Sequence, residues 1–178
     1  MKRKRTRIRA PNLNQLVNHP VKSVSSGTTT VHFDDIHQAI CEQIRKADMV
    51  AGCVAWVTNP IILQELANKT KVTLVVNQES WLKKYKLPGQ GIVTFPSKTK
   101  GVKEINQSRM HNKFLIFYKA GKPYMVGTGS FNLTTNSSNS LETFLFISDS
   151  KIITAMEGYL KSILKTCHQT APKRRKTG

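Results

Sequence analysis

The first half of the chain switches repeatedly between a helical and a strand-like hydrophobic pattern. Isoleucine recurs at every fourth position within 34–46, which is the spacing of one helical face, and an Asp pair at its start is suited to capping. Val-rich apolar runs at 49–58 and 71–77 predict buried strands, and an Asn-Pro pair predicts a capped helix over 60–69 between them. This order predicts an α/β layered domain with a partly parallel sheet.

The second half carries four more strand-like runs and one long helix. Strands are expected at 91–95, 111–118, 122–129 and 142–148, and a helix at about 151–166. A polar basic loop precedes the second of these strands, and a loop rich in Asn and Ser follows the third. We therefore expect an α-β-α arrangement around a mixed sheet.

Both ends of the chain lack hydrophobic periodicity and are strongly basic. We expect a flexible basic arm at 1–28, a single domain at 29–168 and a basic tail at 169–178. Residues 2–9 and 173–176 hold ten of the 28 Lys and Arg residues and none of the ten acidic residues, so the rest of the chain keeps 18 basic and 10 acidic residues, a charge of +8 within a total of +18. A basic body with basic arms suits a polyanion, and nucleic acid is the expected partner, with an anionic membrane surface as the alternative.

Hydropathy and the basic segments of the chain bear on where the protein is located in the cell. No apolar run approaches the roughly 20 residues that span a bilayer, and the basic start is not followed by the apolar stretch of a signal peptide. We expect an intracellular protein, in the nucleus of a eukaryotic or viral host because PKRRK resembles an import signal, and otherwise in the cytoplasm.

Cysteines and carboxylates give no sign of a metal or cofactor. The three cysteines are odd in number and form no C-x-x-C pair, so Cys41 and Cys53 are interpreted as small core residues. The acidic residues are scattered, without the carboxylate cluster of a two-metal nuclease. We expect neither a metal nor another cofactor.

Two short segments carry side chains suited to an anion. His111 and Lys113 stand two residues apart at the start of a strand, so both side chains point to one face. The segment GTGSFN at 127–132 follows another strand, and its glycines permit a close backbone approach while Ser130 and Asn132 offer donors. Together the two segments predict a phosphate site.

The pattern H-N-K, two strands and then G-S-F-N resembles the H-x-K…G-S-x-N signature of the phospholipase D superfamily. Among its members, the single-motif endonucleases of the Nuc and Zucchini type are the nearest resemblance, over about 30–166. Their S-E-N at the next strand is similar to Leu141-Glu142-Thr143. The resemblance implies a phospholipase D-like fold and a phosphodiesterase that cleaves DNA or RNA.

The resemblance also implies a two-step, metal-independent mechanism. One histidine forms a covalent phosphohistidine, and a second protonates the leaving oxygen and then activates water. Lys113 and Asn132 would hold the nonbridging oxygens, Ser130 would assist, and Glu142 would orient a histidine ring. None of the other four histidines stands in such a pattern, so we expect a homodimer in which His111 of both copies shares one cleft.

The chain departs from the family pattern at one position. The family places Asp where this chain has Tyr118, which strand alternation puts on the face opposite His111 and Lys113. A nucleic-acid-binding member with weak or no catalysis therefore remains an alternative, and a phospholipid phosphodiesterase is another. For nucleic acid, we expect a groove lined by a basic loop and an aromatic that stacks on bases, namely Lys98, Lys100, Lys103, Arg109 and Trp81.

Overall fold

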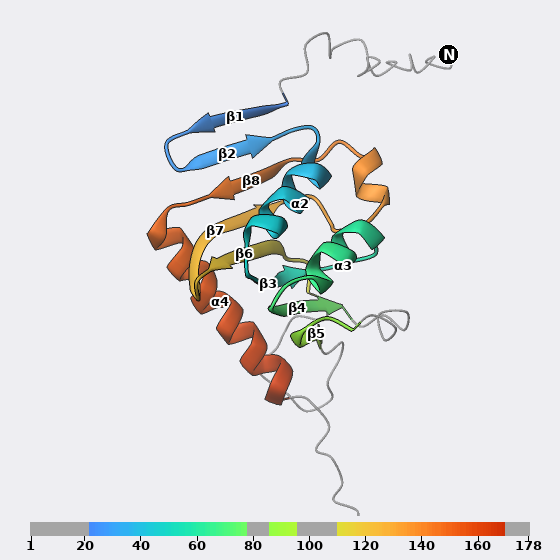
Figure 1. Ribbon diagram of the computed structural model, residues 1–178, viewed down its shortest axis with the longest axis vertical. Coiled ribbons are helices and arrows are strands. Elements are labelled where there is room, and N and C mark those ends of the chain that lie inside the picture. The colour runs from blue at the N-terminus through green and yellow to red at the C-terminus, as the bar shows by residue number, and fades with distance from the viewer. Residues whose placement is uncertain (1–21, 78–85, 96–109, 170–178) are drawn as a thin grey trace, which may run out of the picture.

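The computed structural model describes residues 22–77, 86–95 and 110–169, which form one mixed sheet with helices on both faces (Figure 1). The eight described strands hydrogen-bond in the order β1-β2-β8-β7-β6-β3-β4-β5. The strands are β1 (Ser23–Ser26), β2 (Thr29–His32), β3 (Met49–Val54), β4 (Lys71–Asn77), β5 (Gly89–Phe95), β6 (Lys113–Lys119), β7 (Lys122–Gly129) and β8 (Phe144–Ile147). The helices are α2 (Ile36–Lys46), α3 (Pro60–Ala67) and α4 (Ser150–Gln169), and a 3-10 turn, η2 (Asn136–Asn139), precedes β8.

The predicted partly parallel sheet is confirmed. Strand β3 pairs in parallel with β4, and β4 with β5, whereas the other described pairings are antiparallel. Helix α3 makes the crossover from β3 to β4, as expected for a parallel pair. The strands predicted at 71–77 and 122–129 match β4 and β7 to the residue, while β3 ends at Val54, four residues before the predicted end.

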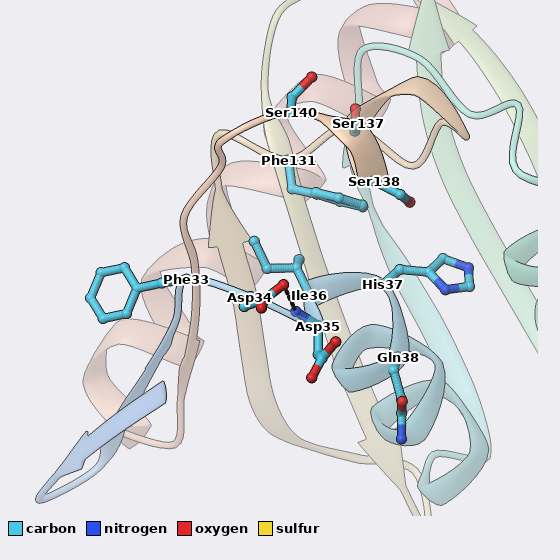
Figure 2. Close-up of a pocket in the computed structure, with 10 residues that line it drawn as sticks. All are labelled: Phe33, Asp34, Asp35, Ile36, His37, Gln38, Phe131, Ser137, Ser138 and Ser140. Atoms are coloured by element: carbon cyan, nitrogen blue, oxygen red, sulfur yellow. Dashed lines mark hydrogen bonds between the residues drawn. The ribbon is translucent and has the colours of Figure 1, made fainter. Parts of the chain in front are cut away.

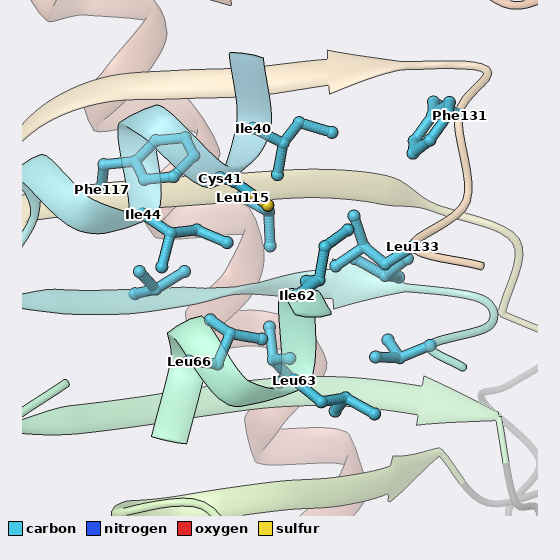
Figure 3. Close-up of a cluster of buried hydrophobic side chains, with 14 of the residues drawn as sticks. Ile40, Cys41, Ile44, Ile62, Leu63, Leu66, Leu115, Phe117, Phe131 and Leu133 are labelled. Carbon is cyan, nitrogen blue, oxygen red and sulfur yellow. The ribbon is translucent and has the colours of Figure 1, made fainter. Parts of the chain in front are cut away.

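Two apolar clusters fill the two sides of the sheet. Helices α2 and α3 cover one face, where Ile40, Ile44 and Leu66 gather with Leu115 and Phe117 of β6 (Figure 3). Helix α4 covers the other face and packs on the alternate residues of β6, with Phe114, Ile116 and Tyr118. Burying side chains of this size contributes about 1.5–3 kcal/mol each, so β6 is fixed from both sides.

The helix starts differ from one another in how they are capped. The predicted cap of α3 is confirmed, because Asn59 Oδ1 accepts the amide N–H groups of Ile61 at 3.0 Å and Ile62 at 3.2 Å. At α2 the cap position falls on Asp35, but its side chain makes no capping bond. Its carboxylate instead pairs with Lys22 at 2.7 Å, so the predicted Asp cap of α2 is wrong.

An N-terminal hairpin lies partly inside the predicted arm. Strand β1 pairs antiparallel with β2, and β2 adds to β8, so the sheet already includes residues 23–26. All four residues of β1 are exposed, so the strand is held by backbone hydrogen bonds and shows no apolar periodicity. The rest of the predicted arm at 1–21 and the tail at 170–178 lie outside the described residues.

All three cysteines are buried and free of disulfides, which confirms the core interpretation of Cys41 and Cys53. Burial raises the pKa of Cys53 to about 12, so its thiol stays protonated at neutral pH. In the described part of the chain, none of the helices has the length and apolar composition needed to cross a bilayer.

The topology gathers several strand ends on one side of the sheet. We call such a side, which is formed by the ends of the strands and not by an outer strand, an edge. Strands β3, β4 and β7 end there, and β6 and β8, antiparallel to their neighbours, begin there. The segments that carry His111, Lys113, Ser130, Asn132 and Glu142 all adjoin these ends. The fold thus brings together residues that are up to about 30 positions apart in sequence.

Candidate active site

His111 and Lys113 form the centre of the site. The Lys113 ammonium lies 3.3 Å from both ring nitrogens of His111, and it donates to the His111 carbonyl oxygen at 3.2 Å. His111 is exposed, whereas Lys113 is half-buried as the first residue of β6. Burial lowers the pKa of Lys113, and the negative charge of Glu142 acts in the opposite direction. Their close approach leaves one anion able to contact both side chains.

Trp56 completes the centre and was missed by the sequence analysis. Its ring stands edge-on to the His111 imidazole with 5.4 Å between ring centroids, and the Lys113 ammonium lies 6.0 Å from the Trp56 centroid. The reason is the register of the antiparallel β3–β6 pair, in which Val54 opposes Lys113. Hydrophobic pattern alone does not give that register, although an aromatic just past a strand end is a weak sign of a site.

Ser130 and Glu142 are joined on the neighbouring strands. The Ser130 hydroxyl donates to the Glu142 carboxylate and accepts the Thr143 N–H at 3.1 Å. The Ser130 N–H in turn donates to the Thr143 carbonyl at 3.0 Å. In the described structure Glu142 thus supports Ser130, and the role in orienting a histidine ring that the resemblance implied stays a prediction.

The two glycines of GTGSFN permit the close approach that the sequence predicted. A Cβ on Gly129 would lie 2.1 Å from the Thr143 carbonyl oxygen, and one on Gly127 would lie 2.7 Å from the Phe144 ring. Such distances are shorter than any van der Waals contact, so a side chain at either position would push β7 away from β8. Glycine is therefore required to bring Ser130 against Glu142.

Asn132 is held beside the end of β3. The next residue, Leu133, accepts the Thr58 N–H at 2.9 Å and the Asn59 N–H at 3.0 Å, and it forms an isolated bridge with Val57. The Asn132 Oδ1 atom is buried and has no hydrogen-bond partner. Buried polar groups are normally satisfied, so this amide is suited to meet a ligand.

A second amide at the same edge was also missed. Asn77 ends β4, its N–H donates to the Ala55 carbonyl at 3.4 Å, and its Nδ2 is buried without a partner. Asn112, between the two motif residues, points elsewhere, because its Nδ2 donates to the Tyr159 hydroxyl on α4 at 3.1 Å. Its carbonyl accepts the Ala55 N–H at 2.9 Å, which anchors the start of β6.

Tyr118 lies away from the site, as strand alternation predicted. It is buried in the cluster under α4, and its hydroxyl donates to Glu157 Oε1 at 3.2 Å. Burial, together with the charge of Glu157, raises the pKa of Tyr118 well above its usual range. The substitution of the family's Asp therefore changes the contact between β6 and α4, not the surroundings of His111.

The remaining predicted binding residues, Lys98, Lys100, Lys103, Arg109 and Trp81, lie outside the described residues. Phe95, the last residue of β5, is buried in the core. Within 22–77, 86–95 and 110–169, no three His, Cys, Asp or Glu side chains gather as a metal site would require.

A pocket of about 280 Å³ lies between the start of α2 and η2 (Figure 2). Phe131, the residue between Ser130 and Asn132, forms one wall, and the opposite wall carries Asp34 and Asp35. Lys22 offsets the charge of Asp35, and the Asp34 carboxylate would repel a phosphate. The pocket is therefore distinct in charge from the His111–Lys113 centre.

Comparison with known proteins agrees with this geometry. A family model described as "Cardiolipin synthase, PLD-like domain" matches residues 30–164. An uncharacterized protein of Acanthamoeba polyphaga mimivirus is 29% identical over 199 aligned residues, covering 86% of this chain and 70% of the viral protein.

Two solved structures share the fold at low sequence identity. NucT from Helicobacter pylori matches with a TM-score of 0.58 and 19% identity, over 78% of this chain and 96% of NucT. Nuc from Salmonella typhimurium, described as a phospholipase D family member, matches with a TM-score of 0.58 and 15% identity, over 78% of this chain and 94% of Nuc. Because the family model spans most of the chain, and the fold is that of the single-motif Nuc-type proteins, this protein belongs to the family of phospholipase D-like (PLD-like) domains.

Proposed function

We propose that the protein is a metal-independent endonuclease that cleaves DNA or RNA through a phosphohistidine formed on His111. The observation that carries the proposal is the Lys113 ammonium 3.3 Å from both nitrogens of the exposed His111 ring. An imidazole beside a fixed cation is suited to attack a phosphate, because the cation neutralises the nonbridging oxygens that would otherwise repel the nucleophile.

The reaction has two steps, and in each step one bond to phosphorus forms while another breaks. In the first, a ring nitrogen of His111 bonds to phosphorus while the bond from phosphorus to the leaving oxygen breaks, and a second imidazole protonates that oxygen. In the second, the same imidazole removes a proton from water, the resulting oxygen bonds to phosphorus, and the phosphorus–nitrogen bond breaks. Lys113 and the unpartnered amide of Asn132 are suited to hold the oxygens throughout.

We assign the second imidazole to another copy of the chain. His32 and His37 make other contacts: His32 packs edge-on to Phe146, and His37 contacts Cys41 with 3.8 Å between Nε2 and Sγ. A twofold homodimer would bring two copies of His111 to one phosphate. The exposure of His111 at the edge of the sheet supports this arrangement.

Nucleic acid is favoured over phospholipid as the substrate. The net charge of +18 suits a polyanion, and Trp56 presents an aromatic ring next to His111 on which a base could stack. The competing proposal, a binding protein without catalysis, rests on Tyr118. Its position under α4 disfavours that proposal, because the substitution leaves the phosphate-binding side chains in place.

The test is cleavage of labelled single-stranded and duplex DNA and RNA in EDTA, beside vesicles of cardiolipin and of phosphatidylcholine. The wild-type protein is compared with His111→Ala and with His37→Ala, a matched loss of a histidine outside the site. We expect cleavage of nucleic acid by the wild-type and His37→Ala proteins and none by His111→Ala. Binding without cleavage by the wild type would establish the competing proposal, and recovery of cleavage only with magnesium would reject the metal-independent mechanism.

A further inference from the structure

A second charged surface lies at the edge of the sheet opposite the candidate active site. Helix α2 and strand β6 end at this edge, and β4 and β7 begin there. Five of the eleven described lysines occupy these ends, and we call them the distal lysine edge: Lys46, Lys69, Lys71, Lys119 and Lys122.

The register of the sheet brings these lysines to the same end of the strands. Met49, the first residue of β3, opposes Lys71 on one side and Tyr118 on the other, so Lys71 and Lys119 flank the same strand. Across the hairpin, Lys119 directly opposes Lys122. The remaining two lie at the adjoining end of α2, where Lys46 is the last residue and the Lys69 ammonium donates to the Ala47 carbonyl at 3.1 Å.

Most of the charge of this edge has no ionic partner among the residues that the structure describes. The ion pairs in the described part of the chain involve Lys22, Arg45 and Lys161, and none involves a lysine of the distal edge. Asp48 also lies at the distal lysine edge, because its carboxylate accepts the Ala120 N–H of the β6–β7 turn at 2.7 Å. Five lysines and one aspartate leave a charge of +4.

The hairpin between β6 and β7 holds Lys119 opposite Lys122, and the repulsion between the two ammonium groups lowers the stability of the fold. Ala120 and Gly121 both have positive φ, 50° and 75°, which is typical of the tight two-residue turn that fixes a hairpin. Lys119 and Lys122 therefore cannot move apart through the backbone, and like charges directly opposite on paired strands are destabilising. An anion bound between them would remove this repulsion.

We propose that the distal lysine edge binds a second stretch of the phosphate backbone of the nucleic acid that is cleaved at His111. The inference rests on the proposed function for the identity of the polyanion. Strand β6 runs from Lys113 at the site to Lys119 at the distal edge, six steps of about 3.3 Å, or about 20 Å. Because α2, α3 and α4 cover the two faces of β6, the nucleic acid must pass around the domain, so at least about six phosphates of one strand of a duplex separate the two contacts.

Nucleic acid fits this edge better than an anionic membrane does. Proteins that bind a membrane surface combine basic residues with apolar side chains that enter the lipid. The exposed large hydrophobic residues of the described chain are Val24, Phe33, Ile61, Leu141, Ile152 and Tyr159, and none is next to a distal lysine in sequence. The edge is thus a surface of ammonium groups, as phosphate binding requires.

The test compares two variants that each lose two exposed lysines. The variant Lys119→Gln/Lys122→Gln changes the distal edge, and Lys151→Gln/Lys165→Gln removes the same charge from α4. Binding of a 30-base-pair duplex is measured by anisotropy across a salt series with the His111→Ala change in all proteins. We expect the dependence of log K on log salt to become shallower by about two for the distal variant alone. Equal affinities and equal salt slopes for the two variants would overturn the proposal.

Substrate length and a lipid probe separate this proposal from the proposed function. With His111 intact, a four-nucleotide substrate is too short to reach both edges, so the distal variant should cleave it at the wild-type rate while losing activity on the long substrate. A selective change in salt slope in a protein that cleaves nothing would support the distal edge and refute the nuclease. Loss of binding to phosphatidylglycerol vesicles, with duplex binding unchanged, would reject nucleic acid as the ligand.

Discussion

The Tyr118 hydroxyl donates a hydrogen bond to Glu157 Oε1 at 3.2 Å, joining β6 to α4 on the face of the sheet away from His111. The residue that distinguishes this chain from the family pattern thus has a structural contact of its own. Its carboxylate partner also lies 3.5 Å from the Lys161 ammonium. We therefore expect changes at position 118 to alter stability and leave the chemistry at His111 unaffected.

The first prediction concerns Tyr118→Phe. Removing the hydroxyl should lower the free energy of unfolding by about 1 kcal/mol, measured by urea denaturation, with cleavage by the folded protein unchanged. Tyr118→Asp should destabilise more, because it would bring a buried carboxylate close to Glu157. Loss of cleavage in a fully folded Tyr118→Phe protein would contradict a purely structural role.

Tyr118 also predicts a dependence of stability on alkaline pH. Its pKa is raised in the folded protein, so above pH of about 10 the unfolded chain releases the phenol proton first. Deprotonation then favours unfolding, and the stability that is present below that pH declines as the pH rises. Denaturation of wild type and Tyr118→Phe from about pH 8 to about pH 11, a range that spans the usual pKa of tyrosine, should show a smaller decline in the variant.

The second prediction concerns the charge of Glu142. Because Glu142 raises the pKa of Lys113 against the effect of burial, Glu142→Gln should let that pKa fall further. The ammonium would then be lost at lower pH, and the alkaline limb of the kcat/KM profile should move to lower pH. Glu42→Gln, an exposed change on α2, is the matched control and should leave the profile in place. An unshifted profile for Glu142→Gln would show that its charge does not act on Lys113.

The third prediction concerns Trp56. If its ring stacks on a base of the substrate, Trp56→Ala should raise KM for single-stranded substrate by about tenfold, the lower part of the range for base stacking, while Trp56→Phe should lose less. The substrate is also prepared with an abasic linker beside the scissile phosphate. On that substrate the wild type and Trp56→Ala should have similar KM values. A defect of equal size on both substrates would assign Trp56 to positioning His111 instead.

Sequence alone predicts the elements with a strong hydrophobic pattern. The isoleucines of α2 and the Val-rich runs of β3 and β4 satisfy both local preference and burial, so their order was sufficient to predict the mixed sheet. Strand β1 was missed because four exposed residues carry no apolar signal and are held by backbone pairing to β2. The Asp35 cap was wrong because an ion pair with Lys22, 13 positions away in sequence, takes its carboxylate.

The residues of the candidate active site also fall into two groups, those that a local sequence pattern reveals and those that depend on strand pairing. His111, Lys113, Ser130 and Asn132 belong to short linear patterns and could be selected from sequence. Trp56 and Asn77 reach the site only through strand register, which links residues more than 30 positions apart and is not encoded in a local pattern. The Ser130–Glu142 contact likewise depends on the pairing of β7 with β8.

The last prediction tests the shared site directly. If each cleavage event needs His111 from two subunits, a dimer with one His111→Ala chain has no complete pair of imidazoles. Wild-type and His111→Ala chains are therefore refolded together in known ratios at constant total concentration, and activity is measured after subunit exchange. Activity should follow the square of the wild-type fraction, giving about one quarter at equal amounts, whereas an enzyme complete in one chain would give about one half. His37→Ala mixed in the same way should leave activity constant, which separates loss of the second imidazole from an effect of mixing, and a linear decline with His111→Ala would mean that one subunit alone performs both proton transfer and attack.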